Sequence, residues 1–371
     1  MRAVILVGGE GTRLRPLTSE EPKPVVPLAG RPLMAYMLDW LAGAGVTEVV
    51  MACGFLPDRM EEVLGDGSRY GLAITYVAEP EPMGTGGALR FADEQLPGGL
   101  GERFVMCNGD VLTDLDLRRQ IELHEELGAL ATLGLAPVED PTAYGLVRVN
   151  EDLSVAGFLE KPDPAEIDTD LISAGAYVLE RPVLDLIEPG RNVSIEREVW
   201  PRLVGEGLYG IADREAYWLD IGTPGRYLEA TADILSGRAR TAVAAELDAD
   251  GLLVAPGARV EGELVGPAMV GEGAVIEAGA VVGPGSVLGP GATVASGARV
   301  VRSVVLDRSR VEEDAVLEDA IVAADARIGA GSQVTGLAVI GPRAVVGAQN
   351  RLKDGVRLFP GVELGERAVA S

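Results

Sequence analysis

The sequence predicts an α/β protein in which a Rossmann-like, mostly parallel sheet precedes a left-handed parallel β-helix of hexapeptide repeats. Through residue 237, short β-rich runs alternate with stretches of helical spacing, and such alternation builds a mostly parallel sheet covered on both faces. From about residue 251, aliphatic side chains recur every six residues between glycine-rich fillers, which is the pattern of a hexapeptide β-helix. We therefore expect a sheet domain at 1–237, a linker at 238–250 and a β-helix domain at 251–371.

The first domain contains four apolar, β-rich runs and three stretches with helical spacing. Ligands on a parallel sheet bind outside the carboxyl ends of its strands. The loops after Val7, Val77 and Cys107 are therefore where we expect functional residues. Strands are expected at Ala3–Val7, Glu48–Ala52, Ile74–Val77 and Phe104–Cys107, and helices at Arg31–Ala44, Pro57–Leu64 and Gly86–Gln95.

The aliphatic positions of the second domain keep their six-residue spacing in three successive blocks. Each triangular coil of such a β-helix takes about eighteen residues and points one aliphatic side chain per short face inward. From Gln349 onward the hexad breaks, and we expect this tail to cap the last coil. The side chains expected to point inward are Val270, Ile276, Val282, Leu288, Val294, Val300, Val305, Val311, Leu317, Val322, Ile328, Val334, Ile340 and Val346.

The charge of the chain restricts its partners. Among 371 residues, 57 are acidic and 32 are basic, which gives a formal net charge of −25. A surface this negative repels a polyphosphate backbone and argues against nucleic acid as a partner. A small phosphorylated ligand remains compatible, because a few positive groups can be focused in one cleft.

The sequence carries no sign of export or membrane insertion. The apolar run that opens the chain is too short for the core of a signal peptide, and no later run is long enough to span a bilayer. Cys53 and Cys107 lie in apolar runs without zinc-site spacing, so we expect buried free thiols. We therefore expect a cytoplasmic protein without a membrane partner.

The first loop, Gly8-Gly9-Glu10-Gly11-Thr12-Arg13-Leu14-Arg15, directly follows a strand. Glycines there let the backbone approach a phosphate and expose its N–H donors, and the two arginines would add bidentate grips. The spacing fits neither the G-x-G-x-x-G dinucleotide fingerprint nor a Walker loop. A tight turn without a ligand is the alternative interpretation.

Lysine is scarce in this arginine-rich chain, which contains only Lys23, Lys161 and Lys353. Lys23 stands between two prolines, and Lys161 precedes another. A compact ammonium held beside proline indicates a geometric need that the wider guanidinium cannot meet. We therefore expect functional roles for Lys23 and Lys161 and interpret Lys353 as a surface residue.

Asp110 and Asp220 are expected at the ends of strand-like runs. A carboxylate that leaves a buried strand at the ligand edge is well placed for a hard cation such as Mg²⁺. Two carboxylates, one ion and triphosphate oxygens would complete an octahedral set. Each aspartate alone would equally suit the start of a turn.

Several motifs occur in one order and together resemble a known family. They are the first loop, Pro22-Lys23-Pro24, Gly84-Thr85-Gly86-Gly87, Asn108-Gly109-Asp110, Glu160-Lys161-Pro162 and Trp218-Leu219-Asp220-Ile221-Gly222. Over roughly residues 1–235 the chain resembles the sugar-1-phosphate nucleotidyltransferases, or NDP-sugar pyrophosphorylases. The stretch Val193–Pro201 is typical of the mannose-1-phosphate guanylyltransferase branch, and a hexapeptide domain is the family's usual companion.

The resemblance implies an enzyme that uses Mg²⁺ to join a nucleoside triphosphate and a sugar-1-phosphate, with release of pyrophosphate. It implies catalytic roles for Arg13, Lys23, Asp110 and Lys161, and metal binding by Asp110 and Asp220. The nucleotide would contact Leu6, Gly8, Gly9, Gly11, Thr12, Arg13, Gly84, Thr85, Asn108 and Gly109. The sugar phosphate would contact Tyr144, Gly145, Glu160, Lys161, Ser173, Ala174 and Gly175.

The implied reaction needs no general base, because the attacking phosphate oxygen is already anionic near neutral pH. This agrees with a chain whose one histidine, His124, lies in the helix-like run Arg119–Leu127. Catalysis would come from alignment and charge neutralisation.

Glu79 and Glu81, in the loop after Val77, bear on the choice of base. Guanine offers two adjacent donors, N1–H and the 2-amino group, which suit a carboxylate. Thymine and uracil offer one donor flanked by acceptors, which a carboxylate would repel. These glutamates therefore favour GTP, then ATP, over pyrimidine nucleotides, unless both are solvated loop charges.

Other functions remain open on the sequence. Ser173 departs from the branch, which usually has asparagine there, so glucose-1-phosphate thymidylyl-, uridylyl- or adenylyltransferase remains an alternative. A nucleotide-sugar-binding regulatory subunit is a second alternative. Hexapeptide acyltransferases rely on a histidine that residues 238–371 lack, so we expect the coils to support a homo-oligomer instead.

Overall fold

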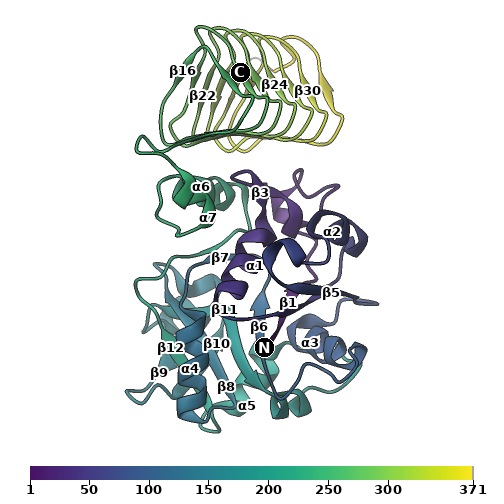
Figure 1. Cartoon of the computed structure of the whole chain (residues 1–371), viewed down its shortest axis with the longest axis vertical. Coiled ribbons are helices and arrows are strands. Elements are labelled where there is room, and N and C mark those ends of the chain that lie inside the picture. Colours follow the sequence, from purple (N-terminus) through teal and green to yellow (C-terminus); the bar gives the residue numbers. More distant parts are fainter. Residues whose placement is uncertain (370–371) are drawn as a thin grey trace. The chain divides into compact units, whose positions relative to one another are not determined.

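The computed structural model describes residues 1–369 and divides into two compact units (Figure 1). Unit 1 consists of Met1–Glu10 and Met34–Trp218. Unit 2 consists of Gly11–Leu33 and the chain from Leu219 onward. The segment that carries Arg13 and Lys23 therefore belongs to the same unit as the hexapeptide repeats.

Unit 1 is built on one mixed sheet with a parallel centre. β1 is the parallel neighbour of both β4 and β6, β5 pairs in parallel with β4, and β11 pairs with β6 in the antiparallel direction. The fold class predicted from the sequence is confirmed. The strands of this sheet are β1 (Arg2–Val7), β4 (Glu48–Cys53), β5 (Ala73–Ala78), β6 (Arg103–Asn108), β8 (Ala131–Pro137), β9 (Gly145–Val149), β10 (Val155–Glu160), β11 (Leu171–Glu180) and β12 (Leu208–Ala212).

Helices cover the sheet because each has one apolar stripe to bury. α3 packs against β1 and β4, whereas α4 packs against β8 and β11. The helices of the chain are α1 (Leu33–Gly43), α2 (Pro57–Leu64), α3 (Gly84–Gln95), α4 (Leu117–Leu127), α5 (Trp200–Leu203), α6 (Pro224–Leu235) and α7 (Ala242–Glu246), the last of which lies inside the predicted linker. The shorter elements are η1 (Thr12–Leu14), η2 (Lys23–Val25), η3 (Ser68–Tyr70), η4 (Pro141–Ala143), η5 (Pro164–Glu166), η6 (Arg181–Leu186), the π-helix η7 (Ile195–Val199), β2 (Pro27–Leu28), β3 (Arg31–Pro32), β7 (Val111–Thr113) and β13 (Trp218–Asp220).

The predicted strands of unit 1 differ from the observed ones by one residue at most at each end, and α2 agrees at both ends. α1 starts at Leu33 and not at Arg31, because Arg31 and Pro32 form a short strand with Pro27–Leu28. The residue before a proline favours extended backbone, which delays the helix. α3 starts two residues before its predicted start, at Gly84.

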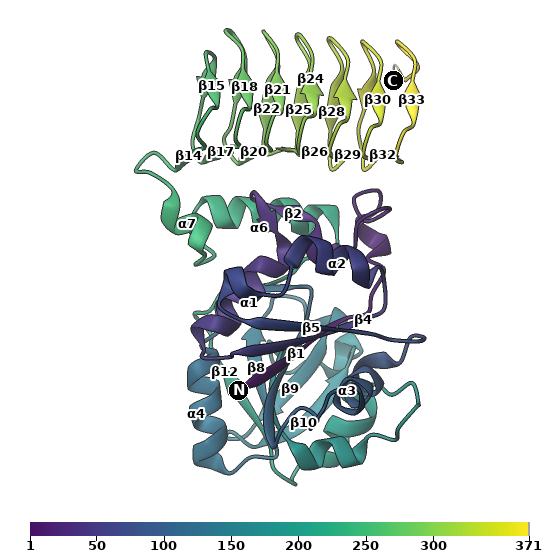
Figure 2. The same ribbon diagram turned by 45° about the vertical axis from the view of Figure 1, so that its right-hand side comes forward.

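Unit 2 contains a parallel β-helix of the predicted left-handed type, whose three faces are three parallel sheets (Figure 2). All fourteen side chains expected to point inward are buried, with at most 1% exposure. The first face holds β14 (Leu252–Val254), β17 (Ala268–Val270), β20 (Ser286–Leu288), β23 (Val304–Val305), β26 (Ile321–Val322), β29 (Val339–Ile340) and β32 (Arg357–Leu358). The second holds β15 (Arg259–Val260), β18 (Val275–Ile276), β21 (Thr293–Val294), β24 (Arg310–Val311), β27 (Arg327–Ile328), β30 (Val345–Val346) and β33 (Glu363–Leu364). The third holds β16 (Glu263–Leu264), β19 (Val281–Val282), β22 (Arg299–Val301), β25 (Val316–Glu318), β28 (Gln333–Thr335) and β31 (Arg351–Leu352).

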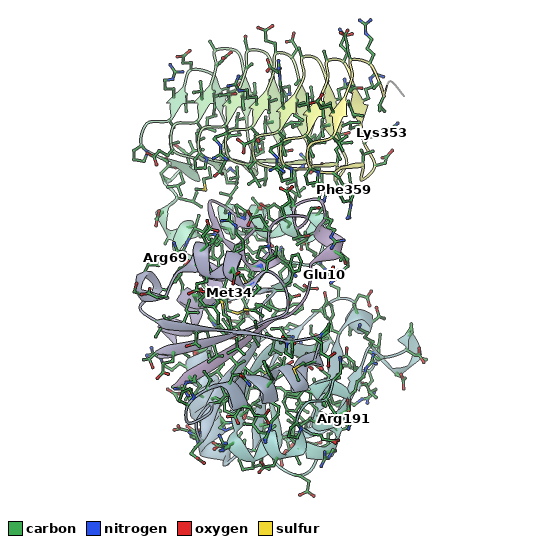
Figure 3. The ribbon with its side chains drawn as sticks, turned by 90° about the vertical axis from the view of Figure 1, so that its right-hand side faces the viewer. Glu10, Met34, Arg69, Arg191, Lys353 and Phe359 are labelled. Carbon is green, nitrogen blue, oxygen red and sulfur yellow. The ribbon has the colours of Figure 1, made fainter. Side chains whose placement is uncertain are left out.

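The expectation that the tail from Gln349 breaks the hexad is wrong. Leu352, Leu358 and Leu364 keep the six-residue spacing, and their strands pair in parallel with the preceding coil. The charged residues between them obscure the pattern in the sequence but point outward. Lys353 is exposed on this last part of the β-helix, in agreement with its interpretation as a surface residue (Figure 3).

Within unit 2, the β-helix and α6 hold the segment Gly11–Leu33. Arg343 forms an ion pair with Glu20 at 2.6 Å, and Arg357 donates to the carbonyl oxygen of Arg15 at 2.8 Å. The hydroxyl of Tyr227 on α6 donates to the carbonyl oxygen of Pro27. Among the described residues, no helix is long and apolar enough to cross a membrane.

Candidate active site

Three parallel strands of unit 1 end side by side, and a glycine follows each: Gly8 after β1, Gly54 after β4 and Gly109 after β6. A Cβ atom on Gly54 would lie 2.5 Å from the carbonyl oxygen of Gly8. One on Gly109 would lie 2.4 Å from the Cγ1 atom of Val7. The backbones pass so closely at this edge that glycine is required at both positions. Gly9, by contrast, has open space around the position of a Cβ atom.

The carboxyl ends of β1 and β6 and the amino-terminal half of the antiparallel β11 bring predicted nucleotide-binding and sugar-binding residues together. The N–H of Gly109 donates to the carbonyl oxygen of Leu6 at 3.0 Å. Gly175, with φ +74°, has room for no side chain, because a Cβ atom would lie 2.9 Å from the Nδ2 atom of Asn108. Leu6, Asn108, Gly109 and Gly175 therefore form one continuous surface at this end of the sheet.

Glu79, which follows β5, lies against the first glycine loop. A Cβ atom on Gly8 would lie 3.0 Å from the Oε1 atom of Glu79, and the N–H of Met83 donates to Oε2 at 3.3 Å. Burial raises the pKa of the half-buried Glu79 carboxyl, and the hydrogen bond from Met83 partly opposes this effect. Glu81 is exposed. The structure thus distinguishes two glutamates that the sequence left equivalent.

Glu160 and Lys161 meet the Tyr144-Gly145 pair because β10 and β9 are antiparallel neighbours. The position of a Cβ atom on Gly145 lies 3.2 Å from the Oε2 atom of Glu160, so glycine leaves room for the carboxylate. The N–H of Lys161 donates to the carbonyl oxygen of Tyr144 at 2.9 Å, with Lys161 at φ +53°. A lysine in this left-handed conformation is uncommon and is typical of functional positions.

Trp218 packs against Tyr144 of the predicted sugar-binding residues. Its ring meets that of Tyr144 edge to face, with centroids 5.2 Å apart. Its Nε1–H donates to the carbonyl oxygen of Ala174 at 2.8 Å. Trp218 was named in a motif but not among the predicted site residues. Its indole donor and large ring, two residues before Asp220 in the sequence, were the signals for this anchoring role.

Ser173 faces a buried tyrosine. Its hydroxyl and that of Tyr177 are 2.9 Å apart, across an irregularity in the pairing of β11 with β8. Burial raises the pKa of Tyr177 far above its usual range, so this phenol stays protonated. Because the Ser173 hydroxyl already has a partner, its capacity for a further contact is limited.

Unit 2 gathers the predicted charged site residues Arg13, Lys23 and Asp220 together with Gly11 and Thr12. The Nζ atom of Lys23 lies 4.0 Å from the Oδ1 atom of Asp220. The guanidinium of Arg13 lies against Gly222, where a Cβ atom would be 2.7 Å from Nη2. Gly11, at φ +63°, lets the loop turn back so that its Cα faces Lys23. Thr12 begins η1, directly before Arg13.

Asp110 belongs to unit 1 and Asp220 to unit 2. Both carboxylates are partly exposed and follow or end a strand, as the sequence predicts. Their shared binding of one ion stays a prediction. Within residues 1–369, no group of three or more histidine, cysteine, aspartate or glutamate side chains is arranged to hold a metal ion.

The remaining titratable groups with marked sequence signals are structural. His124 is fully buried, with Nδ1 2.7 Å from the Thr132 hydroxyl and Nε2 3.2 Å from Glu180. Burial lowers the pKa of His124, and Glu180 opposes this shift. Cys53 and Cys107 are buried free thiols, as predicted. Burial raises the pKa of Cys53 to about 12 and that of Cys107 further, so neither is a reactive thiolate.

Comparison with known proteins identifies the family of the chain. Residues 2–237 match the nucleotidyl transferase family model, and residues 264–370 match a second model described as the GMPPB C-terminal domain. Mannose-1-phosphate guanylyltransferase of Mycobacterium tuberculosis is 42% identical over 282 residues, which are 74% of this chain and 76% of that protein. Probable mannose-1-phosphate guanylyltransferase 1 of Oryza sativa subsp. japonica is 37% identical over 281 residues, 74% of each chain.

The crystal structure of HddC from Yersinia pseudotuberculosis complexed with GMP-PN matches with a TM-score of 0.52 and 27% identity, and covers 62% of this chain and 97% of that chain. The chain therefore belongs to the nucleotidyl transferase family, and the class of enzyme predicted from the motifs is confirmed. Within that family, its similarity extends to the mannose-1-phosphate guanylyltransferases of bacteria, fungi and plants.

Proposed function

We propose that this chain transfers a guanylyl group from GTP to mannose-1-phosphate, which gives GDP-mannose and pyrophosphate. One observation carries the choice of nucleotide: Glu79, and not Glu81, is half-buried against Gly8 and fixed by Met83. Relatives named for the same reaction match 74% of the chain and support the choice of sugar. A structural relative bound to GMP-PN also supports a guanine nucleotide.

The predicted phosphate-binding residues would each hold one of the two reactants. A phosphate oxygen of the sugar phosphate attacks the α-phosphorus of GTP, and the bond to the β-phosphate oxygen breaks as pyrophosphate leaves with the electron pair. Arg13 and Lys23 would hold the phosphates of GTP, and Lys161 would hold the phosphate of the sugar. Neutralising charge between two anionic reactants is the main task, and no proton needs to move.

Asp110 and Asp220 fit Mg²⁺ by their donor chemistry. Mg²⁺ prefers hard oxygen ligands and is commonly bound by one or two carboxylates together with substrate phosphates. Both residues are partly exposed at strand ends, whereas the Oδ1 atom of Asp220 is itself buried. When bound, the ion would supply charge neutralisation at the phosphates. Lys23, at 4.0 Å from Asp220, would keep that carboxylate oriented.

Guanine would be recognised by the Glu79 carboxylate, which can accept from both N1–H and the 2-amino group. A hydrogen bond to a charged group contributes about 1.5–3 kcal/mol, enough to favour GTP about tenfold or more over a base that offers one donor. The Met83 N–H bound to Oε2 restrains the carboxylate and so lowers the cost of ordering it.

The experiment is a panel of four nucleoside triphosphates against mannose-1-phosphate and glucose-1-phosphate with Mg²⁺, measured by release of pyrophosphate. We expect the highest kcat/KM with GTP and mannose-1-phosphate. A preference for a pyrimidine nucleotide would contradict the role of Glu79. A preference for glucose-1-phosphate would indicate that Ser173, with its partner Tyr177, selects glucose instead of mannose. No pyrophosphate in any pair would favour a regulatory subunit.

We further propose that the protein is a cytoplasmic homo-oligomer that associates through its β-helix. Several large apolar side chains are exposed there, including Leu337 at 43%. Phe359, labelled in Figure 3, is exposed at 50%. Repeated flat faces of stacked strands suit contacts between identical subunits. Sedimentation of the full chain would test this, and a monomer at micromolar concentration would contradict it.

A further inference from the structure

The segment Arg191–Glu196 is docked onto the start of α3, more than a hundred residues earlier in the chain. The carbonyl oxygen of Val193 accepts from the N–H groups of Gly86 at 2.8 Å and Gly87 at 3.3 Å. The N–H of Val193 donates in turn to the carbonyl oxygen of Met83 at 2.9 Å. Backbone hydrogen bonds on both sides of Val193 therefore fix this segment against the glycine motif.

The Gly84-Thr85-Gly86-Gly87 motif is explained by this docking. A Cβ atom on Gly84 would lie 2.6 Å from the carbonyl oxygen of Val193, and one on Gly87 would lie 2.3 Å from that of Arg191. Neither backbone contact can give way without moving the segment. The glycines thus allow the close approach of two chain segments, whatever other contact Gly84 makes with a nucleotide.

Thr85 and Ser194 fix the carboxylate of Glu196. Both hydroxyls donate to the Oε2 atom of Glu196 at 2.7 Å, and the N–H of Ile195 donates to Thr85 Oγ1 at 2.9 Å. Within residues 1–369, no donor from the protein reaches the other carboxylate oxygen, Oε1. Glu196 stands in the π-helix η7, and π-helical turns are frequent at functional sites.

The π-helix that carries Glu196 lies beside a strand of the predicted sugar pocket. η7 packs against β10, the strand that ends in Glu160. Burial, and next to it the negative charge of Glu196, raise the pKa of Glu160, while the charges of Lys161 and Arg197 oppose this shift. The same negative charge of Glu196 contributes to the raised pKa of Tyr177, the partner of Ser173. Glu196 is therefore close enough to Glu160 and Tyr177 for its charge to act on both.

We propose that Glu196 is the second carboxylate of the sugar site and selects among sugar-1-phosphates by accepting hydrogen bonds from their hydroxyl groups through Oε1. This inference rests on the proposed function. Two carboxylates facing each other are unfavourable unless donors lie between them, and the hydroxyls of a hexose are donors of this kind. Because Ser173 is already bonded to Tyr177, Glu196 supplies the recognition that an asparagine would give in its place.

The test is Glu196→Gln, with Glu198→Gln as the matched control on the same π-helix. A glutamine can still accept from Thr85 and Ser194, so the docking survives while the charge is lost. We expect KM for mannose-1-phosphate to rise about tenfold or more, because a hydrogen bond to a charged acceptor is replaced by a weaker one. KM for GTP should change less than twofold, and the preference for mannose-1-phosphate over glucose-1-phosphate should fall. Glu198 is exposed and, among residues 1–369, its side chain accepts only from the backbone N–H of Ser194, so its variant should keep both KM values.

The pH profile provides a second readout that a purely structural role would not change. Sugar binding by ionised Glu160 is lost as the pH falls through its raised pKa. Removing the charge of Glu196 lowers that pKa, so the acidic limb of kcat/KM for the sugar phosphate should move to lower pH in Glu196→Gln. The effects of burial, Lys161 and Arg197 on the pKa of Glu160 are the same in the variant and in the wild type. The difference between the two pH profiles therefore reports the charge of Glu196.

The outcomes separate this inference from the proposed function. If wild-type protein uses another nucleotide or sugar, the proposed function fails, and the same KM and pH comparison on the preferred sugar phosphate still tests Glu196. Unchanged sugar KM, sugar preference and acidic limb in Glu196→Gln would overturn the inference. Equal rises in both KM values together with a lower Tm would also overturn it, since they indicate a structural role alone.

Discussion

The β-helix of unit 2 and the sheet of unit 1 place their important side chains by different means. In the β-helix, neighbours in space are one coil apart in the sequence, as in the pairing of Val311 with Ile328. In unit 1, the Thr85 hydroxyl that holds Glu196 lies 111 residues away from it. In a repeat, the contacts of each residue can therefore be read from the local sequence. The candidate site instead depends on contacts between segments that are distant in the sequence and are brought together by the fold of the whole sheet.

The largest expected effect concerns residues that no local pattern could pair. Asp110→Asn and Asp220→Asn should each reduce turnover by about 10²–10³, the usual cost of removing one electrostatic contact at a transferring phosphoryl group. Pyrophosphate release at saturating Mg²⁺ measures it, and circular dichroism checks that the fold remains. Near-wild-type activity of either variant would exclude that aspartate as a metal ligand. The candidate site would then no longer depend on pairing these two distant residues.

Within the β-helix, Ile328→Ala should lower the free energy of unfolding by about 2–5 kcal/mol, because the cavity left by a fully buried isoleucine is filled poorly. Arg327→Ala, one residue earlier and on the outward side, is the control and should change stability little. Denaturant unfolding measures both. Equal effects of the two variants would show that the six-residue pattern does not govern stability there.

Gly87→Ala tests the long-range docking in unit 1. Its Cβ atom would meet the carbonyl oxygen of Arg191 at 2.3 Å, so we expect a loss of about 1–3 kcal/mol from overpacking. Gly9→Ala is the matched control, since a Cβ atom there has open space. If thermal unfolding shows Gly87→Ala to be as stable as wild type, the segment around Val193 is not held as tightly as its hydrogen bonds indicate.

The smallest effect is expected for the choice of base. Glu79→Gln replaces an acceptor of two guanine donors with one acceptor and one donor, so kcat/KM for GTP should fall about tenfold and that for ATP less. Steady-state kinetics with both nucleotides measures the ratio. Glu81→Gln, at the exposed glutamate of the same loop, should leave the ratio unchanged. If Glu81→Gln lowered the ratio of GTP to ATP use and Glu79→Gln did not, Glu81 would be the residue that recognises guanine.

The sequence was sufficient for the fold class, the parallel strands and the inward side chains of the coils, because each depends on local periodicity. It also located motifs at the carboxyl ends of strands. It could not rank Glu79 above Glu81, since their difference lies in burial against Gly8. It could not reveal Glu196, whose partners Thr85 and Ser194 are set by the docking of two segments. The prediction for the tail after Gln349 was wrong, because outward-facing charged residues obscure the six-residue spacing of Leu352, Leu358 and Leu364 in the sequence.

The ion pair between Glu20 and Arg343, together with the bond from Arg357 to the Arg15 carbonyl, has a consequence for engineering. The segment that contains Arg13 and Lys23 is held by coils of the β-helix; Glu20 and Arg343 are 323 residues apart in the sequence. A chimera that exchanges the β-helix for one from another enzyme would remove these contacts to the segment, even though every predicted phosphate-binding residue remained. Grafting schemes should therefore transplant Gly11–Leu33 and the coils as a single cassette.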